Sequence, residues 1–228
     1  MSKIDINSDV FSSRLFVKRD SLMSNFEWNR YNIDIMHPRR KWWSRPFEYK
    51  WIEDICTSYF DSLDNRAVID IATGPSHPGI FILKKLGFKK VVGTDLFDVG
   101  LFQPKEFISE GMEYIKDDIL NPKIEEKFDC ITFISVLEHF HPDNQRKVME
   151  NIISYLKDDG CLILTFDMPG FDYLTNLPLY KEILIENNFS FREVDISKDD
   201  IVVKSSNCSN AGRLARKNLS CYRLFAWR

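Results

Sequence analysis

The chain is 228 residues long and 44% apolar, which suffices for a sizeable core in one domain of ordinary size and argues against disorder. Its 31 Lys and Arg residues against 34 Asp and Glu residues give a formal net charge of -3. The chain therefore lacks the global basic field that drives non-specific nucleic-acid binding. The N-terminus has no apolar signal core, and no stretch approaches the roughly 18 apolar residues of a membrane-spanning helix. We expect a soluble protein with neither nucleic acid nor a membrane as its partner.

The five cysteines are odd in number, far apart and mostly inside apolar runs; they are Cys56, Cys130, Cys161, Cys208 and Cys221. This distribution argues against both a disulfide framework and a zinc site. We therefore expect a reduced, cytoplasmic protein without a bound metal.

Residues 1–63 are predicted to form an N-terminal helical cap that is rich in aromatic and basic side chains. A helix is expected from Pro46 toward Leu63. Two interpretations of the aromatic stretch 42–51 stay open. It is either an amphipathic helix that packs on the sheet edge, or a lid over the bound ligands in which Arg45 pairs with a carboxylate or phosphate.

The following core, residues 64–228, begins with strands and helices in alternation. The predicted strands are Ala67–Ala72, Lys90–Thr94, Met112–Lys116, Cys130–Ile134 and Cys161–Phe166. The predicted helices are Gly79–Leu86 and Asn144–Leu156, and a turn is expected at Asp158–Gly160. This alternation implies a parallel sheet with helices on both faces.

The last part of the sequence has a different pattern. A predicted helix, Tyr173–Asn188, precedes two predicted strands, Phe189–Ile196 and Ser220–Trp227. No helical crossover separates these two strands, so we expect an antiparallel pair at one edge of the sheet. The sequence thus predicts an α/β, Rossmann-like fold with a seven-stranded, mostly parallel sheet, an antiparallel last strand and an N-terminal helical cap.

The run from Val68 to Ser76 joins a short apolar strand to a turn of small residues. A second β-branched strand ends on Asp95 about 20 residues later, which is the layout of a nucleoside-binding βαβ unit. The small residues let the backbone approach a ligand closely, and the Asp95 carboxylate can accept both ribose hydroxyls. We therefore expect an adenosine-type cofactor.

These residues resemble the first motifs of the class I S-adenosylmethionine-dependent methyltransferases, and the resemblance extends from Ala67 to the end of the sequence. The family's first motif is an acidic residue followed by G-x-G-x-G, and here Ala72 and Ser76 replace the flanking glycines. The resemblance implies that Asp95 binds the ribose hydroxyls and that Leu96 and Phe97 lie beside the adenine. The cofactor contacts implied by these two motifs are Asp70, Ala72, Gly74, Pro75, Ser76, Asp95 and Leu96.

Two further motifs follow in family order. Residues 117–119 match the acidic motif after the third strand, where the resemblance implies that Asp118 accepts a hydrogen bond from the adenine amino group; an ordinary turn role stays open. Residues 128–139 resemble the F-D-x-x-x-x-x-x-V-L-E-H signature of small-molecule methyltransferases. These motifs add to the expected cofactor site Asp117, Asp118, Ile119 and Ser135. The resemblance implies S-adenosylmethionine as the cofactor and a small molecule as the methyl acceptor.

Other functions remain as alternatives. A dinucleotide dehydrogenase shares the fold, but its third glycine is missing, and residues 75–78 would crowd that position. DNA amino-methyltransferases carry an N/D-P-P-Y/F motif after the fourth strand, which residues 135–138 lack. A non-catalytic S-adenosylmethionine-binding partner or regulator of another protein is the main alternative, favoured by the altered glycine motif and the aromatic segment.

The acceptor is expected near His139 and His141, just after the fourth strand. A histidine there can remove a proton from an attacking hydroxyl or amine, since its unperturbed pKa is about 6.5. A structural role stays open for both. Basic residues gather in two segments, which contain Arg39, Arg40, Lys41 and Arg45, and Lys204, Arg213, Arg216 and Lys217. We therefore expect an anionic acceptor, such as a phosphorylated metabolite or an activated sugar. The residues expected to bind it are Arg45, Tyr49, Arg213 and Arg216. The oligomeric state is left open.

Overall fold

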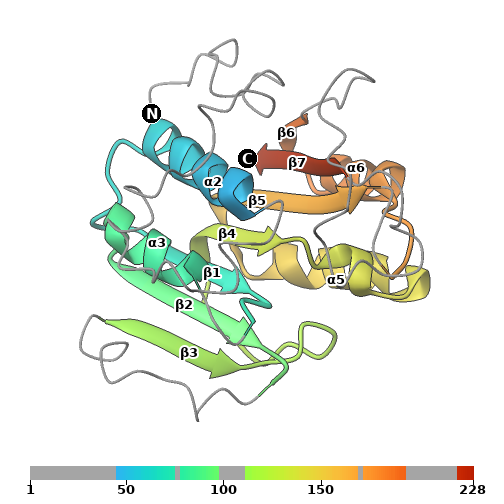
Figure 1. Cartoon of the computed structure of the whole chain (residues 1–228), viewed down its shortest axis with the longest axis horizontal. Coiled ribbons are helices and arrows are strands. Elements are labelled where there is room, and N and C mark those ends of the chain that lie inside the picture. The colour runs from blue at the N-terminus through green and yellow to red at the C-terminus, as the bar shows by residue number, and fades with distance from the viewer. Residues whose placement is uncertain (1–44, 75–77, 98–110, 169–171, 194–219) are drawn as a thin grey trace.

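The computed structural model describes residues 45–74, 78–97, 111–168, 172–193 and 220–228. These residues form one seven-stranded sheet in the order β3-β2-β1-β4-β5-β7-β6, with helices on both faces (Figure 1). The strands are β1 (Ala67–Ile71), β2 (Lys90–Asp95), β3 (Met112–Lys116), β4 (Phe128–Ile134), β5 (Leu156–Met168), β6 (Ser190–Glu193) and β7 (Ser220–Trp227). The helices are α2 (Arg45–Tyr59), α3 (Pro78–Leu86), α5 (Pro142–Ser154), α6 (Leu177–Glu186) and the short 3-10 helix η5 (Leu137–His139). The predicted Rossmann-like fold is confirmed.

Strand direction also agrees with the sequence. β1 pairs in parallel with β2 and β4, β2 with β3, and β4 with β5. β7 pairs antiparallel with both β5 and β6, and it therefore lies between them in the sheet. The predicted antiparallel pair at one edge is confirmed.

The end of α2 differs from the prediction. The helix ends at Tyr59 and does not reach Leu63. The carbonyl of Leu63 instead accepts the N–H groups of Arg66 and Lys89, each at 3.1 Å, in the turn that leads into β1. A carbonyl used in this way is not available to a continuing helix.

The turn predicted at Asp158–Gly160 lies inside a strand, and Leu156, predicted to be helical, begins β5. Leu156 pairs with Phe128, and the register then shifts before Cys130, so the extra residues of β5 form a bulge. A Cβ atom at Gly160 would lie 2.7 Å from Leu156 Cδ1, which explains why glycine occupies the bulge.

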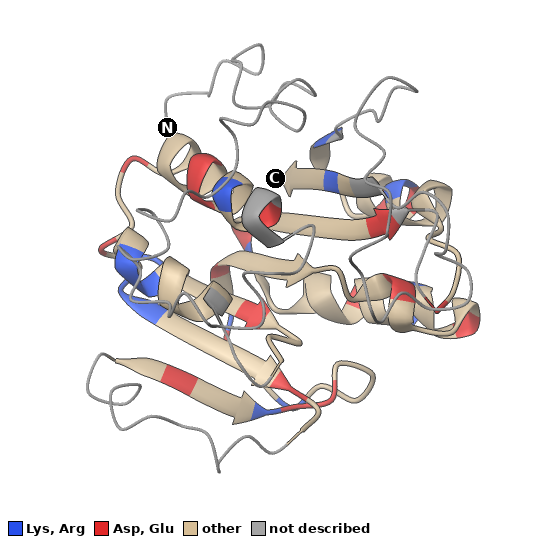
Figure 2. Cartoon of the chain, in the orientation of Figure 1, with Lys and Arg blue, Asp and Glu red and all other residues tan. Residues whose placement is uncertain are grey.

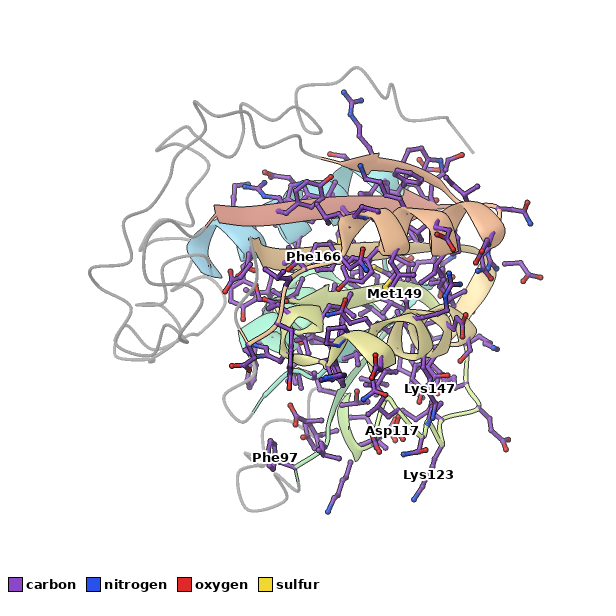
Figure 3. The ribbon with its side chains drawn as sticks, turned by 90° about the vertical axis from the view of Figure 1, so that its right-hand side faces the viewer. Phe97, Asp117, Lys123, Lys147, Met149 and Phe166 are labelled. Carbon is purple, nitrogen blue, oxygen red and sulfur yellow. The ribbon has the colours of Figure 1, made fainter. Side chains whose placement is uncertain are left out.

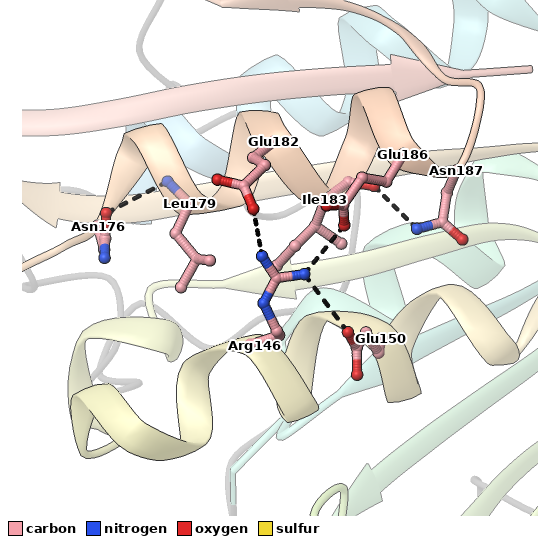
Figure 4. A network of polar contacts seen from close by, with 8 residues as sticks. All are labelled: Arg146, Glu150, Asn176, Leu179, Glu182, Ile183, Glu186 and Asn187. Carbon is pink, nitrogen blue, oxygen red and sulfur yellow. Dashed lines mark hydrogen bonds and ion pairs between the residues drawn. The ribbon is translucent and has the colours of Figure 1, made fainter.

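The start of α6 is also later than predicted. The helix begins at Leu177 and not at Tyr173 because the Asn176 side chain caps it, accepting the Leu179 N–H at 3.2 Å. On the neighbouring helix α5, Arg146 pairs with Glu182 and Glu186 of α6, the latter at 2.9 Å (Figure 4). These exposed pairs align the two helices but add little to the free energy of unfolding.

Side chains of each strand alternate between the two faces of the sheet. Beneath α2 and α3, one hydrophobic cluster contains Val68, Cys130, Ile163 and Phe225. Against α5 and α6, the other contains Ile69, Ile131, Leu164 and Leu224. Figure 3 shows Phe166 and Met149 within this second layer. Both faces of the central strands are therefore buried, as is typical of parallel sheets.

The aromatic helix α2 packs as part of the first layer. Its buried side chains join the cluster of β1, β4 and α3; they are Tyr49, Trp51, Ile52, Ile55 and Cys56. Three buried cysteines in this layer, Cys56, Cys130 and Cys161, are free thiols. Burial raises the pKa of the Cys130 and Cys161 thiols above the usual value, and a hydrogen bond with Cys130, followed by burial, raises that of Cys56, so all three are neutral near pH 7.

Asp129 joins three strands at the amino edge of the sheet. Its carboxylate accepts the Ala67 N–H at 2.8 Å and pairs with Arg66 at 2.9 Å and Lys157 at 2.8 Å. Burial alone would raise the pKa of Asp129, but these three donors lower it below its usual value. The aspartate of the F-D pair is thus a structural residue.

None of the helices in the described ranges combines the length and the apolar character needed to cross a bilayer.

Candidate functional site

The candidate site lies at the carboxyl ends of β1, β2, β4 and β5. The strand order reverses between β1 and β4, and open α/β sheets bind ligands at such a switch point. Acidic residues mark this edge, with Asp95 ending β2 and Asp167 near the end of β5 (Figure 2). The described residues that are predicted to bind the cofactor lie at or after the carboxyl ends of β1, β2, β3 and β4.

The loop after β1 is held against the end of β2. Ala72 and Gly74 have φ angles of 55° and 72°, so the backbone turns sharply in the left-handed region. The Thr73 N–H donates to the Thr94 carbonyl at 2.9 Å, and the Gly74 N–H donates to Asp95 Oδ2 at 2.8 Å. The loop thus follows a fixed path beside the Asp95 carboxylate.

Asp95 and the residues after it fit a nucleoside. The Asp95 side chain is 9% exposed, and its Oδ1 accepts the Phe97 N–H at 3.2 Å. Leu96 and Phe97 are 57% and 69% exposed, and Phe97 extends from the end of β2 (Figure 3). Exposed apolar side chains beside a carboxylate match the two halves of adenosine, an apolar base and a ribose diol.

Thr73 gives a second indication that this loop holds a ligand. The Oγ1 atom of Thr73 is buried, and it makes no hydrogen bond to any of the described residues. A buried hydroxyl without a partner costs free energy, and a bound polar molecule can supply that partner. The residues present therefore fit S-adenosylmethionine, although the flanking glycines of the family motif are absent.

Asp70 lies at the base of the same loop. Its Oδ1 accepts the Thr132 hydroxyl at 2.5 Å, which links the ends of β1 and β4. A Cβ atom at Gly79 would lie 2.8 Å from Asp70 Oδ2 and 3.7 Å from the Tyr49 ring. Sequence reasoning missed Gly79; its signal was a glycine directly after Pro78, at the start of the helix that follows the loop.

The third motif is engaged in local structure. Asp117 accepts the Lys123 N–H at 3.1 Å and the Tyr155 hydroxyl at 2.5 Å. Asp118 accepts the Leu120 N–H at 2.9 Å and also bonds to the side chain of Asn121. Asp118 thus has the turn role that the sequence left open, and its contact with the adenine stays a prediction. The buried Ile119 packs in the second hydrophobic cluster.

Ser135 follows β4 and has an unusual backbone for a non-glycine residue, with φ at 50°. Its N–H donates to the Thr165 carbonyl at 3.0 Å, and its hydroxyl donates to Glu48 Oε1 at 2.5 Å. The Thr165 hydroxyl donates to the same Glu48 atom at 2.6 Å. Glu48 is fully buried, and it brings a carboxylate from α2 to the ends of β4 and β5.

Glu48 was not among the residues singled out from the sequence. The available signal was an acidic residue between the aromatic residues Phe47 and Tyr49, in a helix most of whose buried positions are apolar. Such a residue is buried only if it has polar partners. Those partners, Ser135 and Thr165, are far away in the sequence.

His139 ends the 3-10 helix η5. Its Nδ1 lies 2.6 Å from Asp172 Oδ2, and both side chains are exposed. His141 instead caps α5, with Nδ1 accepting the Asp143 N–H at 3.4 Å, and its ring packs edge-on against Tyr173. His141 Nδ1 also lies 3.3 Å from Asp143 Oδ2, so both histidines have a carboxylate neighbour, but only His141 caps a helix. Asp172 was also missed from the sequence.

Glu138 lies beneath this segment and is fully buried. Its Oε1 accepts the Asp167 N–H at 3.0 Å, and its Oε2 has no hydrogen-bond partner among the described residues. Burial, and then the neighbouring Asp167 carboxylate, raise the pKa of Glu138 well above its usual range. Its surroundings therefore favour the neutral form of Glu138.

The remaining predicted residues are only partly described. Tyr49 is buried in the first hydrophobic cluster, beside Gly79. The backbone of Arg45 begins α2, but its side chain is outside the description. Also outside the described residues are Pro75, Ser76, Arg213 and Arg216. Their contacts stay predictions.

A shallow groove elsewhere is not part of this site. It lies at the amino ends of β4 and β5, and its lining residues are Lys127, Ile153, Ser154, Leu156, Lys157, Asp158, Asp159 and Arg228. Lys157 pairs there with Asp129, and Lys127 donates to the Ser154 carbonyl. Its charged groups thus serve structural contacts at the edge opposite to Asp95.

Comparisons with known proteins agree with the fold. Residues 69–162 match the family model described as a methyltransferase domain. The structure is similar to a magnesium protoporphyrin IX methyltransferase from Synechocystis with bound S-adenosylmethionine (TM-score 0.57, 17% identity, covering 90% of this chain and 93% of that one). It is also similar to a TehB-like S-adenosylmethionine-dependent methyltransferase from Corynebacterium glutamicum (TM-score 0.53, 17% identity, 77% and 86%).

A third similar structure is phosphoethanolamine N-methyltransferase 2 from Haemonchus contortus (TM-score 0.57, 16% identity, 76% of this chain), of which this chain spans 51%. No curated protein has a significant sequence match. Residues 69–162 are thus similar to a methyltransferase domain, and the fold is that of S-adenosylmethionine-dependent class I methyltransferases.

Proposed function

We propose that this protein is an S-adenosylmethionine-dependent methyltransferase that acts on a small polar acceptor with an anionic group, such as a phosphorylated metabolite or an activated sugar. We further propose that His139 is the general base. The observation that carries the proposal is the 2.6 Å contact between His139 Nδ1 and Asp172 Oδ2. His139 ends η5, the short helix that follows β4, and the acceptor is expected near the end of this strand. A carboxylate on Nδ1 fixes the ring and leaves Nε2 as the basic nitrogen.

The methyl donor is assigned to the carboxyl ends of β1 and β2. Asp95 would bind the ribose hydroxyls, and Leu96 and Phe97 would flank the adenine, with Asp118 near its amino group. Asp70 and Ser135 would lie toward the methionine end. When bound, S-adenosylmethionine supplies an electrophilic methyl group on a sulfonium sulfur. The chain's part is to hold the acceptor in a near-attack geometry and to take its proton.

Two features support an anionic acceptor. Two groups of basic residues stand out in the sequence, one around Arg45 and one around Arg213 and Arg216. The first group lies partly outside the described residues, and the second lies wholly outside them. A protein of similar fold, the Haemonchus contortus enzyme, is a phosphoethanolamine N-methyltransferase by name. Charge-assisted hydrogen bonds to a phosphate would select such a molecule over a neutral analogue.

Residues 1–63 are proposed to cover the site. Glu48 and Tyr49 support this, since one bonds to Ser135 and Thr165 and the other packs beside Gly79. We place the reaction in the cytoplasm, because Cys56, Cys130 and Cys161 are free thiols, as is usual for a reducing compartment.

The test combines binding with turnover. Calorimetry with S-adenosylmethionine measures cofactor binding, and formation of S-adenosylhomocysteine measures transfer to matched pairs of acceptors: phosphomonoesters and their parent alcohols or amines. The proposal expects turnover with the phosphorylated member of at least one pair and little with its parent. Faster turnover with the parents would contradict the anionic group. Binding without any turnover would favour the non-catalytic, regulatory alternative.

A further inference from the structure

The Glu48 carboxylate brings a negative charge from the cap helix to the end of the sheet at which methyl transfer is expected. It is fully buried, and two hydroxyls donate to its Oε1, those of Ser135 at 2.5 Å and Thr165 at 2.6 Å. We propose that Glu48 is the residue that recognises the positive charge of the sulfonium, so that the site prefers S-adenosylmethionine over neutral S-adenosylhomocysteine. This inference rests on the proposed donor site.

The order of the strands supports this placement. Asp95, expected to bind the ribose, ends β2, whereas Ser135 and Thr165 belong to the ends of β4 and β5. Two strand spacings, roughly 10 Å in all, separate β2 from β4. With the adenine directed toward β3, the ribose substituent that carries the sulfur is directed toward β4. Glu48 lies over that end.

The hydrogen bonds favour the charged form of Glu48. Two hydroxyl donors to one carboxylate oxygen stabilise the anion. Burial raises the pKa of the neighbouring Glu138 carboxyl group well above its usual range, which favours its neutral form. In a buried environment of low dielectric, a carboxylate acts on a cation across several ångströms more strongly than in water. The charge of Glu48 is therefore suited to distinguish a sulfonium from a thioether.

The same contacts would also exist if Glu48 only fastened α2 to the sheet. The two roles differ in what they predict for the two ligands. A fastening residue affects both equally, because S-adenosylmethionine and S-adenosylhomocysteine share the adenosine and the amino acid. A residue that recognises charge affects only the cationic one. The ratio of the two dissociation constants is therefore the decisive measurement, and it requires no acceptor.

The experiment measures both dissociation constants by calorimetry for the whole chain and for Glu48→Gln. Glutamine keeps an oxygen that can accept the hydroxyls of Ser135 and Thr165 but removes the charge. We expect the dissociation constant of S-adenosylmethionine to rise about tenfold, because the attraction between the carboxylate and the sulfonium is lost. That of S-adenosylhomocysteine should change less than about twofold.

Two variants serve as controls. Glu53→Gln makes the same chemical change on the same helix, where Lys50 lies 3.6 Å away, and should alter neither constant. Asp95→Asn should weaken both ligands by a similar factor, because both contain the ribose. An unchanged ratio of the two constants in a folded Glu48→Gln protein overturns the inference.

A measurement on the unaltered protein decides the case if Glu48→Gln does not fold. The protein should bind S-adenosylmethionine, and the analogue in which a protonated amine replaces the methyl sulfonium, more tightly than S-adenosylhomocysteine. Equal or tighter binding of S-adenosylhomocysteine overturns the inference. If the protein binds none of the three, the proposed donor site itself is wrong, which is a separate outcome.

Discussion

The Gly74 backbone donates a hydrogen bond to Asp95 Oδ2 across 2.8 Å, so one carboxylate both fixes the loop after β1 and faces the expected ribose. Asp95→Ala removes the acceptor of two ribose hydroxyls, a loss on the order of 1.5 to 3 kcal/mol. We expect the dissociation constant of S-adenosylmethionine to rise at least tenfold by calorimetry. Unchanged affinity in a folded Asp95→Ala protein would remove the assignment of the ribose site.

Gly79→Ala should disturb the cofactor loop. The added methyl group would lie 2.8 Å from Asp70 Oδ2, so Asp70 must move and its contact with Thr132 is lost. Alanine favours helix formation by about 1 kcal/mol, which makes a simple loss of stability an unsuitable readout. We expect weaker binding of S-adenosylmethionine in calorimetry.

Gly87→Ala is the matched control for this change. Gly87 has a φ of 111°, and an added Cβ meets nothing within 4 Å. The strained backbone should lower the free energy of unfolding by about 1 kcal/mol without altering affinity. Equal affinities of the two alanine variants would show that Asp70 does not need its present position.

His139→Ala should lower turnover by about 10² or more and leave the affinity for S-adenosylmethionine nearly unchanged, because general base catalysis contributes that much. Asp172→Asn should lower turnover by less, since the base remains but loses its orienting carboxylate. His141→Ala is the comparison, with loss of a helix cap of about 1 kcal/mol measured by urea unfolding. Turnover at the unaltered rate in His139→Ala would exclude it as the base.

The stability contributed by Asp129 should depend on pH. Its donors hold the folded pKa below the unfolded value of about 3.9, so its contribution is full above about pH 4 and is lost as the pH falls through the folded value. Asp129→Asn should therefore destabilise the protein at pH 7, by about 1 to 3 kcal/mol. The difference between the two proteins in urea unfolding should shrink toward pH 3. A difference that is constant with pH would contradict this.

An anionic acceptor should depend on the basic segments. Arg213→Ala/Arg216→Ala should raise the acceptor KM at saturating S-adenosylmethionine, because charge-assisted hydrogen bonds are lost. Added salt should raise the KM of the unaltered protein as well, since exposed charges are screened over about 8 Å at physiological ionic strength. If neither change alters KM across a salt series, these arginines are only solvated.

The sequence predicted the fold and the position of Asp95 at the end of the second strand, because both depend on local patterns. A β-branched strand that ends on an acid, as at Asp95, is visible in six consecutive residues. The bounds of β3 and β7 matched for the same reason. By contrast, the bulge at Gly160 depends on the side chain of Leu156 and on the backbone of the neighbouring strand β4, so a turn was predicted instead.

The contacts that the sequence could not predict join distant segments. Glu48 meets Ser135 and Thr165 across 87 and 117 positions, and these contacts form only after α2 packs on the sheet. Asp172 and His139 are 33 positions apart, and the contact requires the end of β5 to lie beside η5. Composition and periodicity predict which face of each helix or strand is buried. They do not predict which polar side chains form hydrogen bonds with one another.

The position of β7 between β5 and β6 has a consequence for synthesis on the ribosome. β6 precedes β7 in the sequence but lies outside it in the sheet, so β6 has no neighbouring strand until Ser220–Trp227 has emerged. Until then β5, which later pairs with β7 along Cys161–Met168, is an open apolar edge. We therefore expect a stage during synthesis at which the edge of β5 is exposed and accessible to chaperones. Pairing with β7 ends this stage.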